Sequence, residues 1–280
     1  MENKLISSQL LKKKTSSLAK TTKKLLLLVN FLVAMPAMAH QTFMLPNQFN
    51  WKVGDQIDVA LSSSLSFPDF GSGFNVDRIE VSRTFINGVD IPIVKYRKEK
   101  SALHTLFTAS NKGTAVLAIS SKKRHGEIAP KNVDAYFEEI EANEETINAF
   151  HKASAGTPMQ RSYSKHLKTL MCVDKCSIHD KSASQPTGLV LEFVPIENKP
   201  NQFVLLRNGK PLANHKVTQA LTNKKTYFKE TNAEGVFMIE PELSGTLMLG
   251  SVVITVPEEV MGTYHSDYAT LTINLSPSQK

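Results

Sequence analysis

His40 is the residue whose position in the chain points most directly to chemistry. It follows Ala37-Met38-Ala39, whose alanines stand at the −3 and −1 positions of a signal-peptidase site. Cleavage after Ala39 would leave His40 first, so that its imidazole and an α-amine with a reference pKa of about 8 form a chelate. Cleavage after Ala37 would leave His40 third, where amine, amides and imidazole form a square-planar set. Such nitrogen ligands suit Ni(II) or Cu(II), and His40 is therefore a candidate metal ligand. The alternative is an unliganded first residue.

Three further histidines, His104, His125 and His166, are candidates for completing the same site. They form no close H-x-H or H-x-x-x-H pair, so each alone is more simply explained as a surface or hydrogen-bonded histidine than as a ligand. A metal site that uses them must be assembled from distant strands. The same holds for His179, His215 and His265.

The two cysteines, Cys172 and Cys176, have three residues between them. In an oxidising compartment their simplest fate is a local disulfide. Together with His179 they are alternatively candidates for binding a soft metal as thiolates. A redox pair is disfavoured because the spacing is C-x-x-x-C and not C-x-x-C.

Residues 1–39 carry the three parts of a signal peptide. Seven lysines against the single acid Glu2 form a basic region, the apolar run over residues 25–34 follows, and the A-x-A site ends the segment. An uncleaved anchor would need about 20 apolar residues, whereas this run ends before Pro36. A lipoprotein would need a cysteine after the run, and none is there. We therefore predict export to the periplasm or beyond.

Removal of this leader changes the charge of the chain. The 280 residues carry a formal charge of +7 from 33 basic and 26 acidic side chains, but the mature chain would keep 26 basic and 25 acidic ones. A net charge of +1 gives no reason to expect a nucleic-acid partner. The strongest remaining apolar segment, residues 247–256, has about half the length needed to cross a bilayer and reads as a buried strand. The mature chain is thus predicted not to span a membrane.

Most of the mature chain has the alternation and turn chemistry of β-strands. Asn87-Gly88 between two alternating runs predicts a hairpin, and residues 62–73 are expected to form a loop whose aromatic side chains pack on the core or line a site. Lys122-Lys123-Arg124 is interpreted as a solvated loop. Strands are expected at residues 78–86, 91–97, 102–109, 114–120, 189–195, 202–207, 215–221, 225–229, 236–239, 245–256 and 268–275.

Residues 133–152 interrupt this pattern with apolar residues at near-helical spacing and acids elsewhere on the wheel. They predict one amphipathic helix with Asn132 as its cap. The whole pattern predicts a mostly β protein with two antiparallel β-sandwich domains of immunoglobulin-like or transthyretin-like type. We place a signal peptide at 1–39, a sandwich with the helical insert at 40–185, and a smaller sandwich at 186–280.

Residues 207–217 and 231–237 show the pattern G-K-P-L-x-x-x-x-V followed by T-x-x-x-G-x-F. This pattern looks like that of transthyretin-like and carboxypeptidase-regulatory-like sandwiches. The combination of this module with earlier features resembles the secreted bacterial domain-of-unknown-function family 4198, whose members are associated with nickel or cobalt uptake. Those features are Ala39-His40, Pro46, Phe49, Gly54, Phe67-Pro68, and residues 163–168 and 188–195.

The resemblance covers essentially the whole mature chain. It implies a periplasmic protein of two sandwiches that is linked to metal uptake and has a mature N-terminal histidine. The chain departs from the family where a late strand often carries a histidine, because it reads Leu247-Met248-Leu249-Gly250 there.

Enzyme signatures are absent from the sequence, which contains no G-x-S-x-G, H-E-x-x-H, phosphate-binding glycine loop or dinucleotide fingerprint. We therefore expect a non-enzymatic protein. The first hypothesis is a periplasmic divalent-metal-binding accessory protein for nickel or cobalt uptake, with copper as a further candidate, whose partner is a membrane metal transporter or an outer-membrane receptor. The alternative is a β-sandwich binding or adhesion module for an outer-membrane receptor or a polymer. An unrecognised hydrolase is the third hypothesis.

Overall fold

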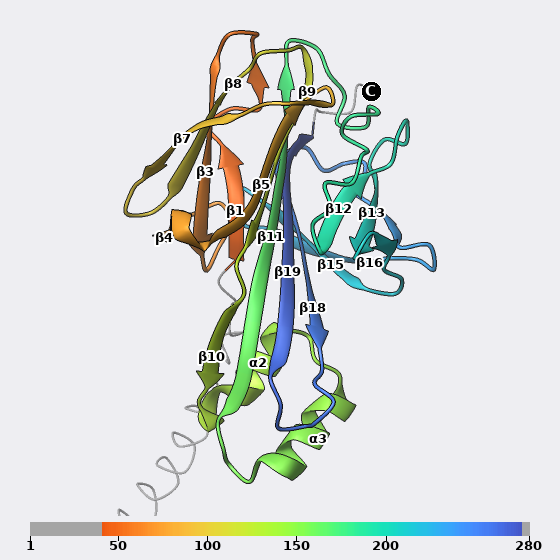
Figure 1. Ribbon diagram of the computed structural model, residues 1–280. Helices are drawn as coiled ribbons and strands as arrows, with labels where there is room; N and C mark the ends of the chain where they lie inside the picture. Colours follow the sequence, from red (N-terminus) through yellow and green to blue (C-terminus); the bar gives the residue numbers. More distant parts are fainter. Residues whose placement is uncertain (1–40, 276–280) are drawn as a thin grey trace, which may run out of the picture. The chain divides into compact units, whose positions relative to one another are not determined.

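The computed structural model describes residues 41–275, which lie within one compact unit and are mostly β. The predicted class of an antiparallel β-sandwich protein is confirmed, because three sheets built almost entirely from antiparallel pairs pack face to face (Figure 1). No helix among these residues is long and apolar enough to cross a membrane.

The first sheet has five strands and contains the start of the described chain. Its order is β1 (Gln41–Pro46), β3 (Gln56–Ser64), β8 (Leu103–Thr108) and β7 (Ile93–Lys98), with the short β4 (Ser72–Gly73) paired to β3. Strand β1 begins at Gln41, which pairs with Ser64 at the end of β3. The residue after His40 is therefore already part of a sheet.

The second sheet has ten strands and runs through the middle of the unit. In spatial order they are β16 (Thr226–Glu230), β15 (Lys216–Leu221), β18 (Gly245–Thr255), β19 (Tyr264–Leu275), β11 (Met159–Val173), β9 (Gly113–Ser121), β5 (Ile79–Ile86) and β6 (Val89–Asp90). Strands β10 (Arg124–Ile128) and β2 (Asn50–Trp51) also pair with β11. The long pair β11 and β19 is parallel, with Arg161 opposite Tyr264 and Thr169 opposite Thr272.

The third sheet is the smallest and lies over the later strands of the second. It contains β12 (Leu191–Pro195), β13 (Gln202–Arg207), β14 (Lys210–Pro211) and β17 (Val236–Met238). Most predicted strands agree with these bounds within a few residues. The Asn87-Gly88 hairpin is confirmed, since both residues have positive φ and join the paired Ile86 and Val89.

The single helix predicted over residues 133–152 is in fact two helices. These are α2 (Val133–Glu139) and α3 (Glu144–Ser154), preceded by the 3-10 turn η2 (Pro130–Asn132); a further 3-10 turn, η1 (Val76–Arg78), precedes β5. The chain breaks at Glu141, whose φ of 55° is left-handed, and restarts at Asn143, whose side chain accepts a hydrogen bond from the Thr146 amide. The expected cap Asn132 makes no such side-chain bond.

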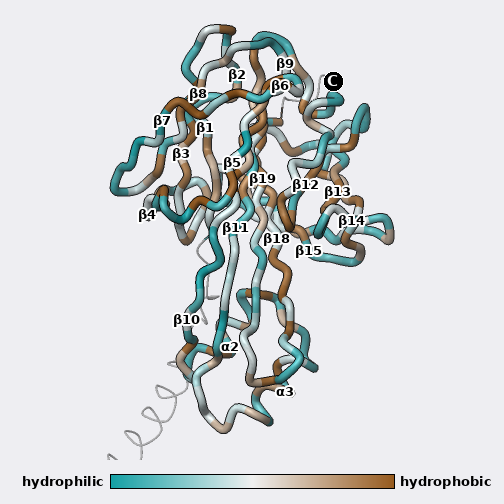
Figure 2. Tube along the Cα trace, in the orientation of Figure 1, coloured by the Kyte–Doolittle hydropathy of each residue, from teal (hydrophilic) through white to brown (hydrophobic). Residues whose placement is uncertain are grey.

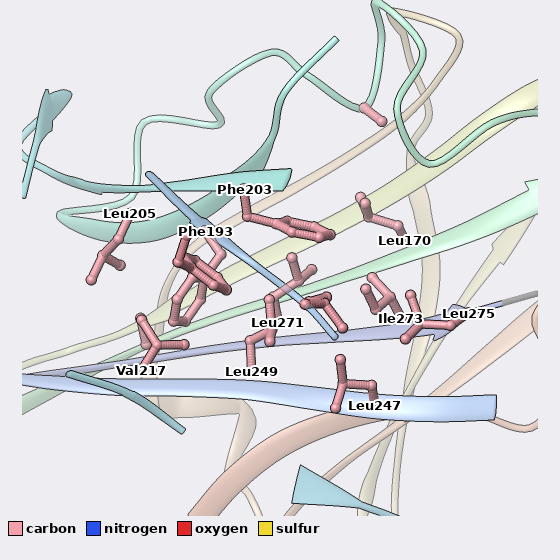
Figure 3. Packing of buried hydrophobic residues seen from close by; sticks show 14 of the residues in the cluster. Leu170, Phe193, Phe203, Leu205, Val217, Leu247, Leu249, Leu271, Ile273 and Leu275 are labelled. Atoms are coloured by element: carbon pink, nitrogen blue, oxygen red, sulfur yellow. The ribbon is translucent and has the colours of Figure 1, made fainter. Parts of the chain in front are cut away.

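The second sheet supplies one wall to each of two hydrophobic cores. On β11, Leu167 and Met171 face the core shared with the first sheet, whereas Leu170 faces the core shared with the third sheet. Strand β9 divides in the same way, with Leu117 in the first core and Val116 in the second. Figure 3 shows the second core, in which Phe193 and Phe203 of the third sheet pack on Leu249 and Leu271 of the second.

Because the second sheet is shared, the boundary expected at residue 185 does not separate two independent sheets. Strands from both sides of it, β11 before and β19 after, pair over nine successive positions. Two sandwiches are present, but they have one sheet in common. Within the described unit, residue 185 lies where the chain leaves the second sheet to begin the third.

Candidate functional site

The predicted metal ligands are not brought together in the described chain. His40 lies outside the described residues. His104 is on β8 in the first sheet, where its Nδ1 is 2.7 Å from Oδ1 of Asp58 and its Nε2 is 3.6 Å from Oε2 of Glu99. His125 is exposed on β10, where it pairs with Ser162 of β11. Residues 41–275 contain no group of three or more His, Cys, Asp or Glu side chains arranged to hold a metal ion.

His166 instead belongs to a buried polar network on the face of β11 that also carries Leu170. Its Nε2 is 2.9 Å from Oδ1 of Asp267, and Nε2 of His265 is 3.3 Å from the same oxygen. The other ring nitrogen of His265 is 2.9 Å from Oγ of Ser162. Burial alone would raise the pKa of Asp267, but the hydrogen bonds from the two imidazoles outweigh it and hold that pKa well below its usual range.

The predicted disulfide is confirmed, since Cys172 and Cys176 are bonded. A cavity of about 330 Å³ lies beside it, lined by mostly neutral side chains from β11, the cysteine loop and the end of β19. Among residues 41–275 its lining includes one histidine, His179, and no carboxylate, so these residues offer little to bind an ion.

The opposite face of β11 carries the most distinctive set of side chains in the described chain. Arg161, Tyr163 and Lys165 alternate along the strand and therefore point to one face. Arg124 of β10 stands opposite Tyr163 in the register, and Tyr268 of β19 stands opposite Lys165. These five residues line a cavity of about 320 Å³, which we call the basic pocket. Figure 2 shows that β10, which carries Arg124, is hydrophilic.

Other elements close the basic pocket around this strand face. The 3-10 turn η1 contributes Arg78, helix α2 contributes Glu139, and β3 and β4 contribute Ser63 and Ser72. Thr42 of β1 reaches the same place, because Lys165 Nζ donates a hydrogen bond to its Oγ1. The start of the described chain is therefore fixed beside the pocket.

Tyr163 organises the positive charges of the pocket. The guanidinium carbons of Arg161 and Arg78 lie 5.1 and 5.8 Å from the centre of its ring, and Lys165 Nζ lies 5.8 Å from it. These distances allow attraction between each cation and the ring. The ring thus holds together three cations that would otherwise repel one another.

The protonation of the pocket follows from its burial. Loss of solvent, followed by repulsion from Arg78, lowers the pKa of Lys165 to about 8. Burial, and then the nearby carboxylate of Glu139, raises the pKa of Tyr268, so its phenol stays protonated and its hydroxyl donates to Glu139 Oε1 over 3.0 Å. The one carboxylate that residues 41–275 contribute to the lining is therefore already engaged.

The sequence does not predict the pocket, because Lys122-Lys123-Arg124 is expected there to be a solvated loop, whereas Arg124 begins strand β10. The pattern Arg161-x-Tyr163-x-Lys165 was the available signal, since cationic and aromatic residues of period two must share one strand face. Arg78 and Glu139 carry no such signal, because they belong to a turn and a helix that are distant from β11 in the sequence.

Comparison with known proteins places the chain in a family but gives little beyond it. A family model described as "Domain of unknown function (DUF4198)" matches residues 37–255. Comparison with curated proteins gives no match.

Solved structures that resemble this chain are distant from it. The "D0-D1 domain of Intimin" is 9% identical with a TM-score of 0.22, covering 81% of this chain and 96% of that one. The "Biofilm associated protein - BSP domain" is 11% identical with a TM-score of 0.20, covering 84% of this chain and 30% of that one. At these scores neither likeness carries an argument about function.

Proposed function

The chain belongs to the DUF4198 family, a domain of unknown function, and from that premise we propose that it is a periplasmic divalent-metal-binding accessory protein linked to nickel or cobalt uptake. Copper is a further candidate ion. The protein binds and does not catalyse, is exported by its N-terminal signal peptide, and acts with a membrane metal transporter or an outer-membrane receptor. Its metal ligand is His40, through the imidazole and the α-amine that cleavage after Ala39 releases.

The observation that supports this proposal is the place of Gln41. Because Gln41 already pairs with Ser64 in β1, a histidine in front of it is attached to an ordered strand and not to a long tail. Thr42, the next residue, is tied to Lys165 and also accepts a hydrogen bond at its carbonyl from Thr270 Oγ1 over 2.9 Å. A ligand directly in front of an ordered strand would lose less conformational entropy on binding a metal than a ligand at the end of a long flexible segment.

The test is a titration of the mature protein with Ni(II), Co(II) and Cu(II) in a calorimeter, after mass spectrometry has established its first residue. We expect about one ion per chain. Affinity should fall at least about tenfold in His40→Ala and in a preparation whose α-amine is acetylated, because each change removes one arm of the chelate. His151→Ala is the matched control, since it removes an exposed imidazole from α3 that is not among the candidate ligands. Equal affinity in all four proteins would remove His40 from the mechanism.

A second candidate function, a binding module for an outer-membrane receptor or a polymer, is favoured by strand β16. This strand forms one edge of the ten-stranded sheet and exposes Tyr227 and Phe228, the latter to 60%. An exposed edge with aromatic side chains is suited to pairing with another chain. Metal-independent capture of an outer-membrane receptor by the mature protein, lost in Phe228→Asp, would favour this function over the first.

A further inference from the structure

The basic pocket is lined by two arginines that each carry a guanidinium nitrogen without an acceptor. Nη2 of Arg78 and Nε of Arg161 are buried and have no hydrogen-bond partner among residues 41–275. A buried donor attached to a charge is costly when it is left unpaired. Both arginines belong to the lining of one cavity, so an acceptor from outside the chain that occupies the cavity would lie beside their guanidinium groups.

The charges of the pocket point to the sign of that acceptor. Its lining includes the four cations Arg78, Arg124, Arg161 and Lys165 against the single carboxylate of Glu139, and that carboxylate already accepts from Tyr268. Within the described residues, the three arginines take part in no ion pair with an acidic side chain. A bare divalent cation would be repelled here, whereas an anion with two or three charges would be neutralised.

The arrangement of the cations points to the class of anion. Arg78, Arg124 and Arg161 come from a turn and two strands, so their planar forks approach the cavity from separate elements and can each pair with a carboxylate through two hydrogen bonds. Phosphate sites are commonly built from backbone amides of a glycine-rich turn or a helix N-terminus. The residues that the described chain contributes to this lining include no glycine, and the one α-helical residue among them, Glu139, ends α2.

From these three observations we propose that the basic pocket binds a small organic anion with two or more carboxylate groups. The cavity of about 320 Å³ is at the lower limit for a small-molecule site, which suits a di- or tricarboxylate. The anion has two sources, the free acid or its complex with a divalent metal. The metal complex as the source rests on the proposed function, in which His40 is the metal ligand. His40 is two residues before Thr42, and Thr42 is hydrogen-bonded to Lys165 of the pocket.

The experiment uses the mature protein and calorimetry at about 0.15 M salt, where long-range charge effects are screened. The probes are citrate, citrate with equimolar Ni(II), acetate and inorganic phosphate. We expect citrate to bind, and acetate and phosphate to bind at least about tenfold more weakly, since citrate offers a separate carboxylate to each of three guanidinium groups, whereas acetate has one carboxylate and phosphate one anionic centre.

Two variants and one control locate the site. Arg124→Ala removes a fork from an exposed position on β10 and should weaken citrate binding about tenfold or more. Arg161→Lys keeps the positive charge but removes the planar guanidinium group, and should also weaken citrate binding. Lys123→Ala is the matched control, because it removes the same charge from the exposed neighbouring residue, which is not in the pocket lining, and should change the affinity less than twofold.

Each result of these titrations either supports or overturns the proposed binding of a di- or tricarboxylate in the basic pocket. Citrate binding that is weakened by Arg124→Ala, unchanged in Lys123→Ala and retained in His40→Ala supports the inference even if the proposed metal function fails. Binding of the nickel complex alone, with the same dependence on Arg124, supports the inference and identifies the metal complex as the source. Absence of binding by either form of citrate, preference for phosphate, or equal weakening in Arg124→Ala and Lys123→Ala would overturn it.

Discussion

At the scale of single residues, the histidines of the described chain differ in their hydrogen-bond partners. His166 and His265 are both bonded to one carboxylate, that of Asp267, whereas His179 is bonded only to neutral backbone groups. Nδ1 of His179 lies 3.2 Å from the Ile196 carbonyl, and its Nε2 accepts from the Asn201 amide over 3.1 Å. These two bonds fit the neutral ring with its proton on Nδ1 and leave no acceptor for a second proton.

His179 should therefore make stability depend on pH. Burial lowers its pKa below the usual value near 6.5, so the unfolded chain binds a proton at a pH where the folded chain does not. The free energy of unfolding should then fall as the pH drops below about 6.5 and level off below the lowered pKa. His179→Gln keeps a donor and an acceptor but does not titrate. We expect urea unfolding to show a smaller loss of stability between pH 7.5 and pH 5 in this variant than in the native protein.

The native protein and His179→Gln share every other titrating group, including His215, whose pKa is also lowered by burial. The difference between the two pH dependences therefore isolates His179. An equal loss of stability in both proteins would show that the ring is protonated in the fold without penalty.

At the scale of elements, an ion pair fastens the second sheet to the third. Lys168 on β11 and Glu192 on β12 are both almost fully buried, with Nζ 3.2 Å from Oε2. Lys168 Nζ also lies 3.2 Å from the Phe193 carbonyl. Glu192 has more partners, because its carboxylate accepts from the amide and hydroxyl of Thr187 and from the amide of Gly188.

Because Glu192 has more hydrogen-bond partners than Lys168, removing one residue of the pair should affect stability differently from removing the other. Lys168→Met leaves a carboxylate with three donors and should lower the free energy of unfolding by about 3 kcal/mol. Glu192→Leu leaves an ammonium with one carbonyl and three donors without an acceptor, and should lower it by more, about 5 kcal/mol. Urea unfolding measures both.

Lys229→Met is the control for this pair, because Lys229 bonds to Glu240 on a half-exposed surface. It should change stability by less than about 1 kcal/mol. A larger loss in Lys168→Met than in Glu192→Leu would contradict the account of the Glu192 donors.

The elements also show what the sequence could predict. Strand β13, expected at residues 202–207, has those bounds, because alternation between polar turns is a local signal. The break between α2 and α3 was missed because Glu141 is a residue type that rarely adopts positive φ. The parallel pairing of β11 with β19 was missed because contact between residues some 100 positions apart leaves no trace in either strand. The basic pocket depends on that pairing, since Tyr268 reaches it from β19.

At the scale of the whole described unit, the shared second sheet should make the two sandwiches unfold together. Leu170 in one core and Leu167 and Met171 in the other belong to the same strand, so loss of either sandwich exposes apolar surface of β11 to water. Burial of one leucine contributes about 1.5–3 kcal/mol, and several on each face of β9 and β11 couple the cores strongly. A division into independent domains at residue 185 predicts the opposite behaviour.

Leu205→Ala distinguishes these two possibilities. Leu205 is fully buried in the core of the third sheet, and its truncation should lower stability by about 2–5 kcal/mol. The only tryptophan of the chain, Trp51, belongs to the other core. If the cores are coupled, Trp51 fluorescence and far-UV circular dichroism should give one coincident urea transition, shifted to the same lower midpoint in the variant. A Trp51 midpoint that stays at its native value while the circular dichroism splits into two transitions would mean that the sandwiches fold independently despite the sheet they share.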